Sequence, residues 1–408
     1  MGKQNTMSKS ASAPNGDSLK WKTVRFDEVV RNVKDKVDRE NTDLTRYVAG
    51  DHMDSEDIHL RRWGELNGDY LGPAFHRRFR EGQVLYGSRR TYLKKVAVAP
   101  FDGITANTTF VLESKDSETL IPAILPFLML TDDFTEHSIR ESKGSVNPYV
   151  NWKDIAKFRF ALPPVDEQHS IVQLLTSADD VAEHYRRVWS DAASVVDALT
   201  IQLLSADWPH QRCETLLVGG PRNGLSPKCN ADGRGAPTIA IGAVREGRIL
   251  TEGNLKYAEV SADDLAKFRL NRGDVLVVRG NGNRDLCGRC GMVDAVPTDC
   301  FYPDLLIKLD FDEKVISPEF AVVQWNHRLA HARLLKQAKS TNGIWKINGK
   351  DIKQHELSVP PIDVQRRFVN ELEDPQKAMA AAENARLAAD RLTLRLANAL
   401  LGAQSHVH

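Results

Sequence analysis

The sequence predicts an α+β protein in which two mixed α/β domains are separated by two long helices that form a coiled coil. A short motif occurs twice in the 408 residues, and its second copy is displaced by 197 residues. Strand-like runs precede each copy, and a long stretch of helical periodicity follows it. Solenoid repeats have periods of roughly 20 to 50 residues. A displacement this long therefore indicates two copies of one unit, an internal repeat with pseudo-two-fold symmetry.

The repeated motif places two prolines before an acidic residue and a glutamine. Its copies are Leu162-Pro163-Pro164-Val165-Asp166-Glu167-Gln168 and Val359-Pro360-Pro361-Ile362-Asp363-Val364-Gln365. At the same displacement Asp154 aligns with Asp351, and Leu199 aligns with Leu396. The duplication therefore extends on both sides of the motif.

This duplication predicts five segments. Residues 1–18 are polar and cannot bury enough apolar surface to offset their ordering entropy, so we expect a disordered tail. Residues 19–160 and 206–357 form the two domains, and residues 161–205 and 358–408 form the two helical spacers. A hydrophobic content of 41% is sufficient to give each domain its own core.

The first spacer shows the periodicity of an amphipathic helix. Apolar residues recur every seven positions from Ile171, and a second series starts at Leu174. The sequence Thr-Ser-Ala-Asp-Asp at 176–180 is typical of a helix N-cap followed by acids in the first turn. We therefore expect a short helix over 167–175 and a separate long helix over 177–204.

The second spacer is expected to break at Pro375. Proline disrupts a helix interior but fits the first helical position, where Asp374 would be the cap. A new helix is thus predicted over 375–401. Its apolar stripe is rich in alanine, which permits close approach of the first helix.

The two domains are similar to each other in outline. Both open with tryptophan, Trp21 in the first domain and Trp208 in the second. Runs rich in β-branched and apolar residues predict strands over 82–86, 95–99, 108–112, 238–241, 273–277 and 305–309. A helical pattern covers 318–336.

Basic segments in both domains are typical of nucleic-acid contact. The chain has 55 basic and 55 acidic residues, so attraction to a polyanion must come from local patches. Arginine and lysine contact phosphates, and arginine and asparagine read guanine and adenine. For any single run, a solvated surface stays an alternative interpretation. The candidates are Arg77, Arg78, Arg89, Arg90, Lys94, Lys143, Asn147, Asn223, Arg279, Asn281, Asn283, Arg284, Lys339, Thr341, Asn342 and Lys346.

Five of these candidates carry the types of side chain and the loop positions best suited to base edges. They are Arg89, Arg90, Arg279, Asn281 and Asn283. By contrast, residues 166–204 are strongly acidic, so this helical segment should keep away from DNA and act as a spacer.

Metal and catalytic motifs are weak in this sequence. Cys287 and Cys290 have zinc-knuckle spacing, but no second pair accompanies them, so ordinary packed thiols are favoured over zinc. Asp102 with 113–115 and Asp304 with 312–314 meet only the loose spacing of a metal-dependent nuclease. No phosphate-binding GxxxxGK[ST] loop occurs. We therefore expect no catalysis, no metal and no cofactor bound by this chain.

No run approaches the ~20 apolar residues that cross a bilayer, and the first 18 residues lack the apolar core of a signal peptide. We expect a cytoplasmic protein.

The duplicated motif, the long helix after each copy and the tryptophan that opens each domain resemble the specificity subunit of type I restriction-modification enzymes. Residues 79–87, 223–226 and 273–276 are also typical of that family. Val364 in place of the Glu167 equivalent and Pro375 in the second helix are departures from the pattern.

The resemblance implies two target-recognition domains that each read one half of an asymmetric bipartite DNA site. The long helices would form an antiparallel coiled coil that holds the domains apart. They would bind two methyltransferase (modification) subunits, and restriction subunits would join through them. S-adenosylmethionine, ATP and Mg²⁺ would be bound by those partners. The expected subunit-contact residues are Pro163, Pro164, Gln168, Pro360, Pro361 and Gln365.

Two other functions stay open at the level of sequence. One is a restriction polypeptide, fused or otherwise, with its own Mg²⁺-dependent nuclease. The other is a coiled-coil scaffold without a nucleic-acid role, which the zero net charge favours. Steep salt dependence of DNA binding would argue against the scaffold.

Overall fold

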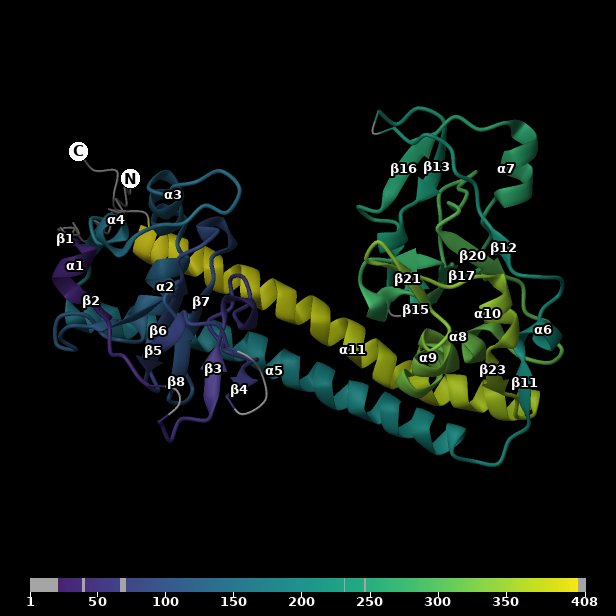
Figure 1. Cartoon of the computed structure of the whole chain (residues 1–408), viewed down its shortest axis with the longest axis horizontal. Coiled ribbons are helices and arrows are strands. Elements are labelled where there is room, and N and C mark those ends of the chain that lie inside the picture. Colours follow the sequence, from purple (N-terminus) through teal and green to yellow (C-terminus); the bar gives the residue numbers. More distant parts are fainter. Residues whose placement is uncertain (1–20, 39–40, 67–70, 231, 246, 403–408) are drawn as a thin grey trace, which may run out of the picture. The chain divides into compact units, whose positions relative to one another are not determined.

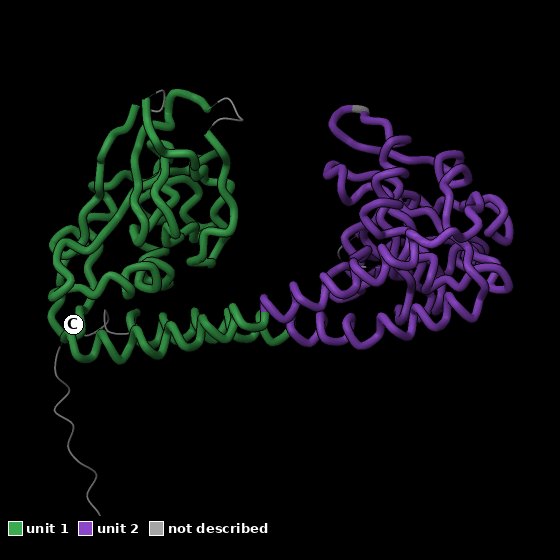
Figure 2. Tube along the Cα trace, turned by 90° about the horizontal axis from the view of Figure 1, so that it is seen from below, with its two compact units in different colours: residues 1–185, 384–408 green, residues 186–383 purple. Residues whose placement is uncertain are grey.

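The chain divides into two compact units, each of which contains a globular part and portions of two long helices. The structure is a computed structural model that describes residues 21–38, 41–66, 71–230, 232–245 and 247–402. Unit 1 comprises residues 1–185 and 384–408, and unit 2 comprises residues 186–383 (Figure 2). The predicted tail, residues 1–18, lies outside the described residues.

Unit 1 contains two four-stranded sheets within its described residues. The first has the order β2-β9-β6-β7, and all its neighbours are antiparallel. The second has the order β4-β3-β8-β5, with β3 and β8 parallel. The strands are β2 (Val30–Val33), β3 (Arg46–Val48), β4 (Gly64–Glu65), β5 (Phe75–Phe79), β6 (Val84–Gly87), β7 (Val96–Val98), β8 (Gly103–Ala106) and β9 (Thr109–Ser114). A separate antiparallel pair joins β1 (Lys22–Arg25) to β10 (Arg159–Leu162).

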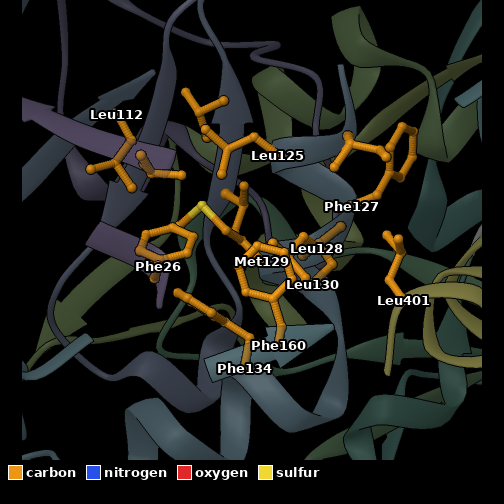
Figure 3. Close-up of a cluster of buried hydrophobic side chains, with 14 of the residues drawn as sticks. Phe26, Leu112, Leu125, Phe127, Leu128, Met129, Leu130, Phe134, Phe160 and Leu401 are labelled. Carbon is orange, nitrogen blue, oxygen red and sulfur yellow. The ribbon is translucent and has the colours of Figure 1, made fainter. Parts of the chain in front are cut away.

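The core of unit 1 is built around a buried helix and closed by the two long helices. All seven residues of α2 (Ile124–Leu130) are buried, and Figure 3 shows Met129 of this helix beside Phe26. Leu175 from the first long helix and Leu401 from the end of the second belong to the same cluster. The remaining helices of this unit are α1 (Phe26–Val29), α3 (Asp132–Arg140) and α4 (Trp152–Ile155), with 3-10 turns η1 (Gly50–His52) and η2 (Thr91–Leu93).

Unit 2 is built on a six-stranded sheet with the order β12-β20-β17-β19-β15-β14. These strands are β12 (Arg222–Asn223), β14 (Val244–Arg245), β15 (Gly247–Ile249), β17 (Val275–Val278), β19 (Cys290–Met292) and β20 (Leu306–Leu309). Smaller sheets are β13 (Ala236–Ile239) with β16 (Leu255–Ala258), β11 (His210–Arg212) with β23 (Glu356–Ser358), and β18 (Gly280–Asn281) with β22 (Ile344–Lys346) and β21 (Lys339–Thr341).

Unit 2 has five short α-helices within its described residues. They are α6 (Cys213–Leu216), α7 (Ala262–Phe268), α8 (Pro318–Asn326), α9 (Arg328–Leu335) and α10 (Gly349–Gln354), with 3-10 turns η3 (Ile241–Ala243) and η4 (Arg284–Leu286). Helix α8 packs against strands β15 and β19 of the six-stranded sheet. The buried cluster includes Trp325 and Phe320 of α8 together with Phe368 and Leu372 of the second long helix. The helix predicted over 318–336 is therefore interrupted, because His327 adopts an extended conformation between α8 and α9.

The first long helix, α5 (Val165–Leu204), is continuous, so the predicted break near Ser177 is wrong. The Thr176 hydroxyl donates to the carbonyl of Val172 one turn earlier, at 2.7 Å, and does not cap a new helix. The acid at position 179 accepts a hydrogen bond from His59 of the same unit. The apparent cap residues thus have other partners within a single long helix.

The second long helix, α11 (Ile362–Ala397), also continues through the predicted break, with Pro375 inside it. A proline in a helix interior costs about 3 kcal/mol. Phe368 and Leu372 are buried before the proline and Ala382 is buried after it, so packing on both sides favours a continuous helix. A π-helical turn, η5 (Asn398–Gly402), completes this segment. Within each unit the long helices run side by side (Figures 1 and 2).

Both copies of the repeated motif make the same three hydrogen bonds at the start of a long helix. The Gln168 amide donates to the carbonyls of Pro163 and Thr119 and accepts from the backbone N–H of Ile121, each at 2.9 Å. In unit 2 the Gln365 amide donates to Pro360 and Val315 at 2.8 and 2.9 Å. It accepts from the N–H of Ser317 at 2.9 Å.

These bonds give part of the predicted subunit-contact set a structural role within the chain. Both glutamine side chains have 0% exposure and their polar atoms are satisfied internally, so they fix the entry into each helix and are not available to a partner. Pro163 and Pro360 are buried as well. Pro164 and Pro361 are exposed, and for them the contact stays a prediction.

None of the helices in the described part of the chain is long and apolar enough to cross a bilayer.

Candidate nucleic-acid interface

In unit 1 two predicted basic segments that are far apart in the sequence meet on one surface. The backbone N–H of Arg90 donates to the carbonyl of Pro148 at 2.7 Å. Lys143 and Tyr149 pair in antiparallel fashion through two backbone hydrogen bonds of 2.8 and 2.9 Å, and Arg89 bridges to Tyr149. We call this surface the first basic face. Its exposed residues are Arg89, Arg90, Lys143, Val146, Asn147 and Tyr149.

The backbone of the first basic face includes an unfavourable conformation. Arg90 adopts the left-handed region with a φ of 50°, immediately before η2. This region costs a non-glycine residue roughly 1 to 2 kcal/mol and is found most often where surrounding contacts enforce it. The hydrogen bond from Arg90 to Pro148 is one such contact. The two arginines are thus presented by a constrained loop.

Four predicted residues of unit 1 have internal partners. One of them, Lys143, stays on the exposed face although its ammonium nitrogen lies 3.4 Å from a carboxylate oxygen of Asp154. Arg77 and Arg78 lie on β5, where Arg77 donates to the carbonyl of Thr109 and Arg78 pairs with Asp102. The side chain of Lys94 is only 14% exposed and lies 3.2 Å from a carboxylate oxygen of Glu56. Asp132 provides a second carboxylate oxygen at 2.8 Å. Because these interactions occupy the cationic groups, they do not support phosphate contact by Arg77, Arg78 and Lys94.

In unit 2 two other predicted segments form a three-stranded sheet. Strand β22 pairs with β18 on one side and with β21 on the other, both antiparallel. Asn281 is thereby opposite Trp345, and Lys339 is opposite Lys346. We call this surface the second basic face. It contains Arg279, Asn281, Asn283, Arg284, Lys339, Asn342 and Lys346, and the backbone of Thr341, whose side chain lies outside the described residues.

A tight hairpin turn shapes the edge of the second basic face. Asn342 and Gly343 have φ angles of 51° and 75°, which is the requirement of a type I′ turn. Asn-Gly is the preferred sequence for this turn. The basic residues of this face were predicted from the sequence but the hairpin was not, although the Asn-Gly dipeptide could have predicted it.

Side chains on the second basic face are partly engaged with one another. The guanidinium of Arg284 lies 4.9 Å from the ring centroid of Trp345, a cation–π contact. The side-chain oxygens of Asn281 and Asn283 accept backbone N–H groups two residues later, each at 2.9 Å. Bidentate contact with adenine needs both the oxygen and the amino group of the amide. For these two asparagines such contact would require the local turns to open.

Arg279 and the segment that follows Asn223 both contact Asp304. Arg279 Nη1 is 3.4 Å from the carbonyl oxygen of Asp304 and 3.8 Å from its carboxylate. Asn223 is exposed on β12, at the edge of the six-stranded sheet. The segment that follows it contacts the same residue, because the N–H of Asp304 donates to Leu225 at 2.7 Å. The structure therefore brings these predicted residues into one neighbourhood.

The weak catalytic and metal patterns are not assembled into sites. Within the described ranges, no group of three or more His, Cys, Asp or Glu side chains is positioned to hold a metal. Asp102 accepts from Arg78 and from the N–H of Glu81, whereas Glu113 accepts from Gln83. These two carboxylates therefore have structural partners of their own.

The cysteines are free, and all except Cys229 are buried. Burial raises the pKa of Cys287 to about 11 and also raises the pKa of Cys290, so both are protonated thiols near neutral pH. Cys287 and Cys290 pack in the core of unit 2 beside Cys213. This packing agrees with the interpretation of ordinary buried thiols.

Part of this chain is similar to proteins of known families. Residues 19–185 match the family model of the type I restriction modification DNA specificity domain. The chain is 32% identical over 278 residues to the type I restriction enzyme EcoKI specificity subunit of Escherichia coli K12, a match to 62% of this chain and 60% of that protein. It is 29% identical over 189 residues to the EcoDI specificity subunit of E. coli, covering 45% and 40%.

The chain thus spans less than two thirds of these relatives. A crystal structure of the type I restriction-modification S subunit from M. genitalium aligns with 95% of this chain and 98% of its own, at a TM-score of 0.54 and 12% identity. At this level of identity the similarity concerns the fold. The chain has the fold of a type I specificity subunit.

Proposed function

We propose that this chain, a relative of the specificity subunits of type I restriction enzymes, recognises an asymmetric bipartite DNA site within a type I complex. One observation carries the proposal. In each unit, basic segments widely separated in sequence come together on one exposed face, at 89–90 with 143–149 and at 279–284 with 339–346. Exposed arginine, lysine and asparagine side chains are the groups that contact phosphates and base edges.

The difference between the two faces supports two different half-sites. The first basic face consists of loops, whereas the second is a small sheet with a hairpin. Since each face presents a different set of side chains, each would read a different base sequence. The two long helices would set the distance between the half-sites.

Partner binding is assigned to the long helices in this proposal. On α5 the apolar residues Leu174, Val181 and Val195 are exposed at multiples of seven residues, and Leu387 and Leu392 are exposed on α11. Residues seven apart lie on one side of a helix, which suits helical partners. We assign the exposed apolar residues of both long helices to contact with two modification subunits, and restriction subunits would join through those subunits. S-adenosylmethionine, ATP and Mg²⁺ would belong to the partners, and this chain would be non-catalytic.

The test is selection of bound duplexes from a random DNA library by the full chain together with its modification subunits. Fluorescence anisotropy would then measure the affinity for the selected duplex at two salt concentrations. The Arg89→Ala, Arg90→Ala double variant should weaken binding, through loss of about 1 to 3 kcal/mol of discrimination for each residue that reads a base. If the arginines contact only phosphates, their loss should instead weaken binding to all duplexes and make the affinity less dependent on salt.

Arg187→Ala is the matched control, because Arg187 is an exposed arginine on acidic α5 and lies outside both faces. It should bind like the unmodified chain. Selection that enriches no sequence would refute the proposed function. DNA cleavage by the chain alone with Mg²⁺ would refute the non-catalytic assignment.

A further inference from the structure

The first basic face presents a strongly exposed aliphatic side chain. Val146 is 90% exposed and lies in the loop between Lys143 and Tyr149. A single exposed aliphatic residue is common on protein surfaces. Its surroundings distinguish this one, since Arg89, Arg90 and Lys143 are exposed on the same face.

The base of this loop is fixed. Besides the paired hydrogen bonds between Lys143 and Tyr149, the Thr91 and Ser142 hydroxyls lie 3.2 Å apart, and the N–H of Val150 donates to Ser88 at 2.9 Å. A β-branched side chain has a restricted χ1 angle, so little side-chain freedom is lost when valine makes a contact. The two ends of the loop that carries Val146 are therefore fixed, and the valine side chain extends from this loop into solvent.

The chemistry of the face points to one group of duplex DNA. Cationic side chains around the valine suit the phosphates, which leaves an aliphatic group directed away from the protein. In the major groove the apolar group on a base edge is the C5-methyl of thymine, which proteins read through apolar side chains. Valine has no flat π-face, so stacking on an unpaired base would fall to Tyr149 or Tyr92 instead.

We propose, on the basis of the proposed function, that Val146 is a specificity-determining residue that contacts the C5-methyl group of a thymine in the half-site bound by unit 1. The contact favours thymine over cytosine at that position. It also favours thymine over uracil, which has the same hydrogen-bonding edge but lacks the methyl group.

Replacement of single thymines by deoxyuracil tests this contact directly. The full chain with its modification subunits is titrated with the selected duplex and with duplexes in which each thymine is replaced in turn. Burial of one methyl group is worth about 0.8 kcal/mol, which corresponds to about a fourfold change in Kd. At one position of the unit 1 half-site, deoxyuracil should weaken binding about fourfold, and Val146→Ala should abolish that difference.

Two control variants keep the result interpretable. Val146→Ile retains an aliphatic group and should retain the sensitivity to deoxyuracil. Val218→Ala removes another strongly exposed valine, which lies in unit 2 outside the second basic face. It should leave the ratio of Kd values for deoxyuracil and thymine unchanged at every position.

The outcomes separate this inference from the proposed function. If every thymine-to-uracil ratio is the same for the Val146→Ala variant and the unmodified chain, the inference is overturned while sequence-specific binding stands. A uniform loss of affinity on all duplexes overturns it in favour of a wedge between base pairs or a protein contact. Absence of any sequence preference in the unmodified chain refutes the proposed function itself.

Discussion

Unit 1 and unit 2 share their junctions with the long helices but differ in their exposed faces. At each junction a buried glutamine makes one set of three hydrogen bonds, to a proline carbonyl, a loop carbonyl and a loop N–H. The strand pairs at the junctions also correspond, β1 with β10 and β11 with β23. The faces correspond only in their backbone pairing, since Tyr149 pairs with Arg89 and Lys143 as Lys346 pairs with Gly280 and Lys339, and their side chains differ. Duplication thus preserves what supports the helices, while the surfaces are free to diverge.

A second difference concerns the opening tryptophans. The Trp21 indole donates to the Glu167 carboxylate at 3.0 Å. Position 364, the equivalent of Glu167, is valine, and the Trp208 indole donates to the carbonyl of Leu203 at 3.1 Å. The departure of the second motif from the first therefore coincides with a different partner for its tryptophan.

The largest expected effect tests whether the two junctions are equivalent. Gln168→Leu and Gln365→Leu each remove a side-chain amide, so that one backbone N–H and two backbone carbonyls lose their hydrogen-bond partner. An unsatisfied buried group costs about 1 to 3 kcal/mol, so each change should destabilise its unit by about 3 kcal/mol. Urea denaturation with hydrogen exchange would locate the loss. Gln173→Leu, at an exposed position on α5, should cost little. A large loss in only one unit would break the equivalence.

A smaller effect tests the independence of the faces. The methyl group that Gly343→Ala adds would contact no neighbouring atom, but the residue has a φ of 75°, which is unfavourable for alanine. Strain of roughly 1 to 2 kcal/mol is therefore expected in the hairpin of unit 2. Binding to variants of one half-site should then weaken, while discrimination within the other half-site is unchanged. The measurement is a comparison of affinities across duplexes that differ in one half-site at a time. Equal losses in both half-sites would contradict the separate roles of the faces.

The tryptophan contacts should have an effect of about 1 kcal/mol. Glu167→Val makes the first motif like the second and removes the acceptor of Trp21. Combined with Trp21→Phe in a double-mutant cycle, it should show coupling in unit 1. The pair Val364→Ala and Trp208→Phe should show none, because no hydrogen bond joins those side chains. Chemical denaturation of the six variants and the parent chain gives both coupling energies.

The smallest effects concern pH, and they have opposite signs in the two units. His59 lies 2.8 Å from Asp179 of α5, and this hydrogen bond raises the His59 pKa above its usual 6.5. Its stabilisation is fully present below pH 6.5 and is lost as the pH rises through the folded-state pKa. His327 lies 3.0 Å from Asp197, but burial lowers its pKa below 6.5. Its stabilisation is present above pH 6.5 and is lost as the pH falls through the folded-state pKa.

Hydrogen exchange at pH 5.5 and pH 8 would measure these effects unit by unit. Acidification should protect the contact of His59 with α5 in unit 1 and weaken that of His327 in unit 2. The His59→Gln and His327→Gln variants should each lose the pH response of their own unit. A response of the same sign in both units would contradict the assignment.

Local patterns predicted elements better than they predicted where those elements end. The strand predicted over 82–86 is β6 at Val84–Gly87, and that over 305–309 is β20 at Leu306–Leu309. The helix breaks at Ser177 and Pro375 were wrong because cap residues and proline express local preferences of about 1 to 3 kcal/mol, which packing along a long helix can exceed.

The candidate interface was predictable as residues but not as surfaces. Basic composition identified 89–90, 143–147, 279–284 and 339–346 separately. Their association depends on backbone pairings between residues 60 and 64 positions apart, Arg89 with Tyr149 and Asn281 with Trp345. Charge counts also could not identify which cations have internal partners, and Lys94 between Glu56 and Asp132 is the clearest case.

The place of Leu401 in the core of unit 1 has a consequence for biosynthesis. This side chain packs in one cluster with Phe26, although nearly the whole chain separates them. The backbone N–H of Asp132 likewise donates to the side chain of Asn398. During translation the core of unit 1 therefore stays incomplete, with part of its interior exposed, until α11 and η5 have left the ribosome. Premature termination near residue 390 would damage the first-made unit more than the one made after it.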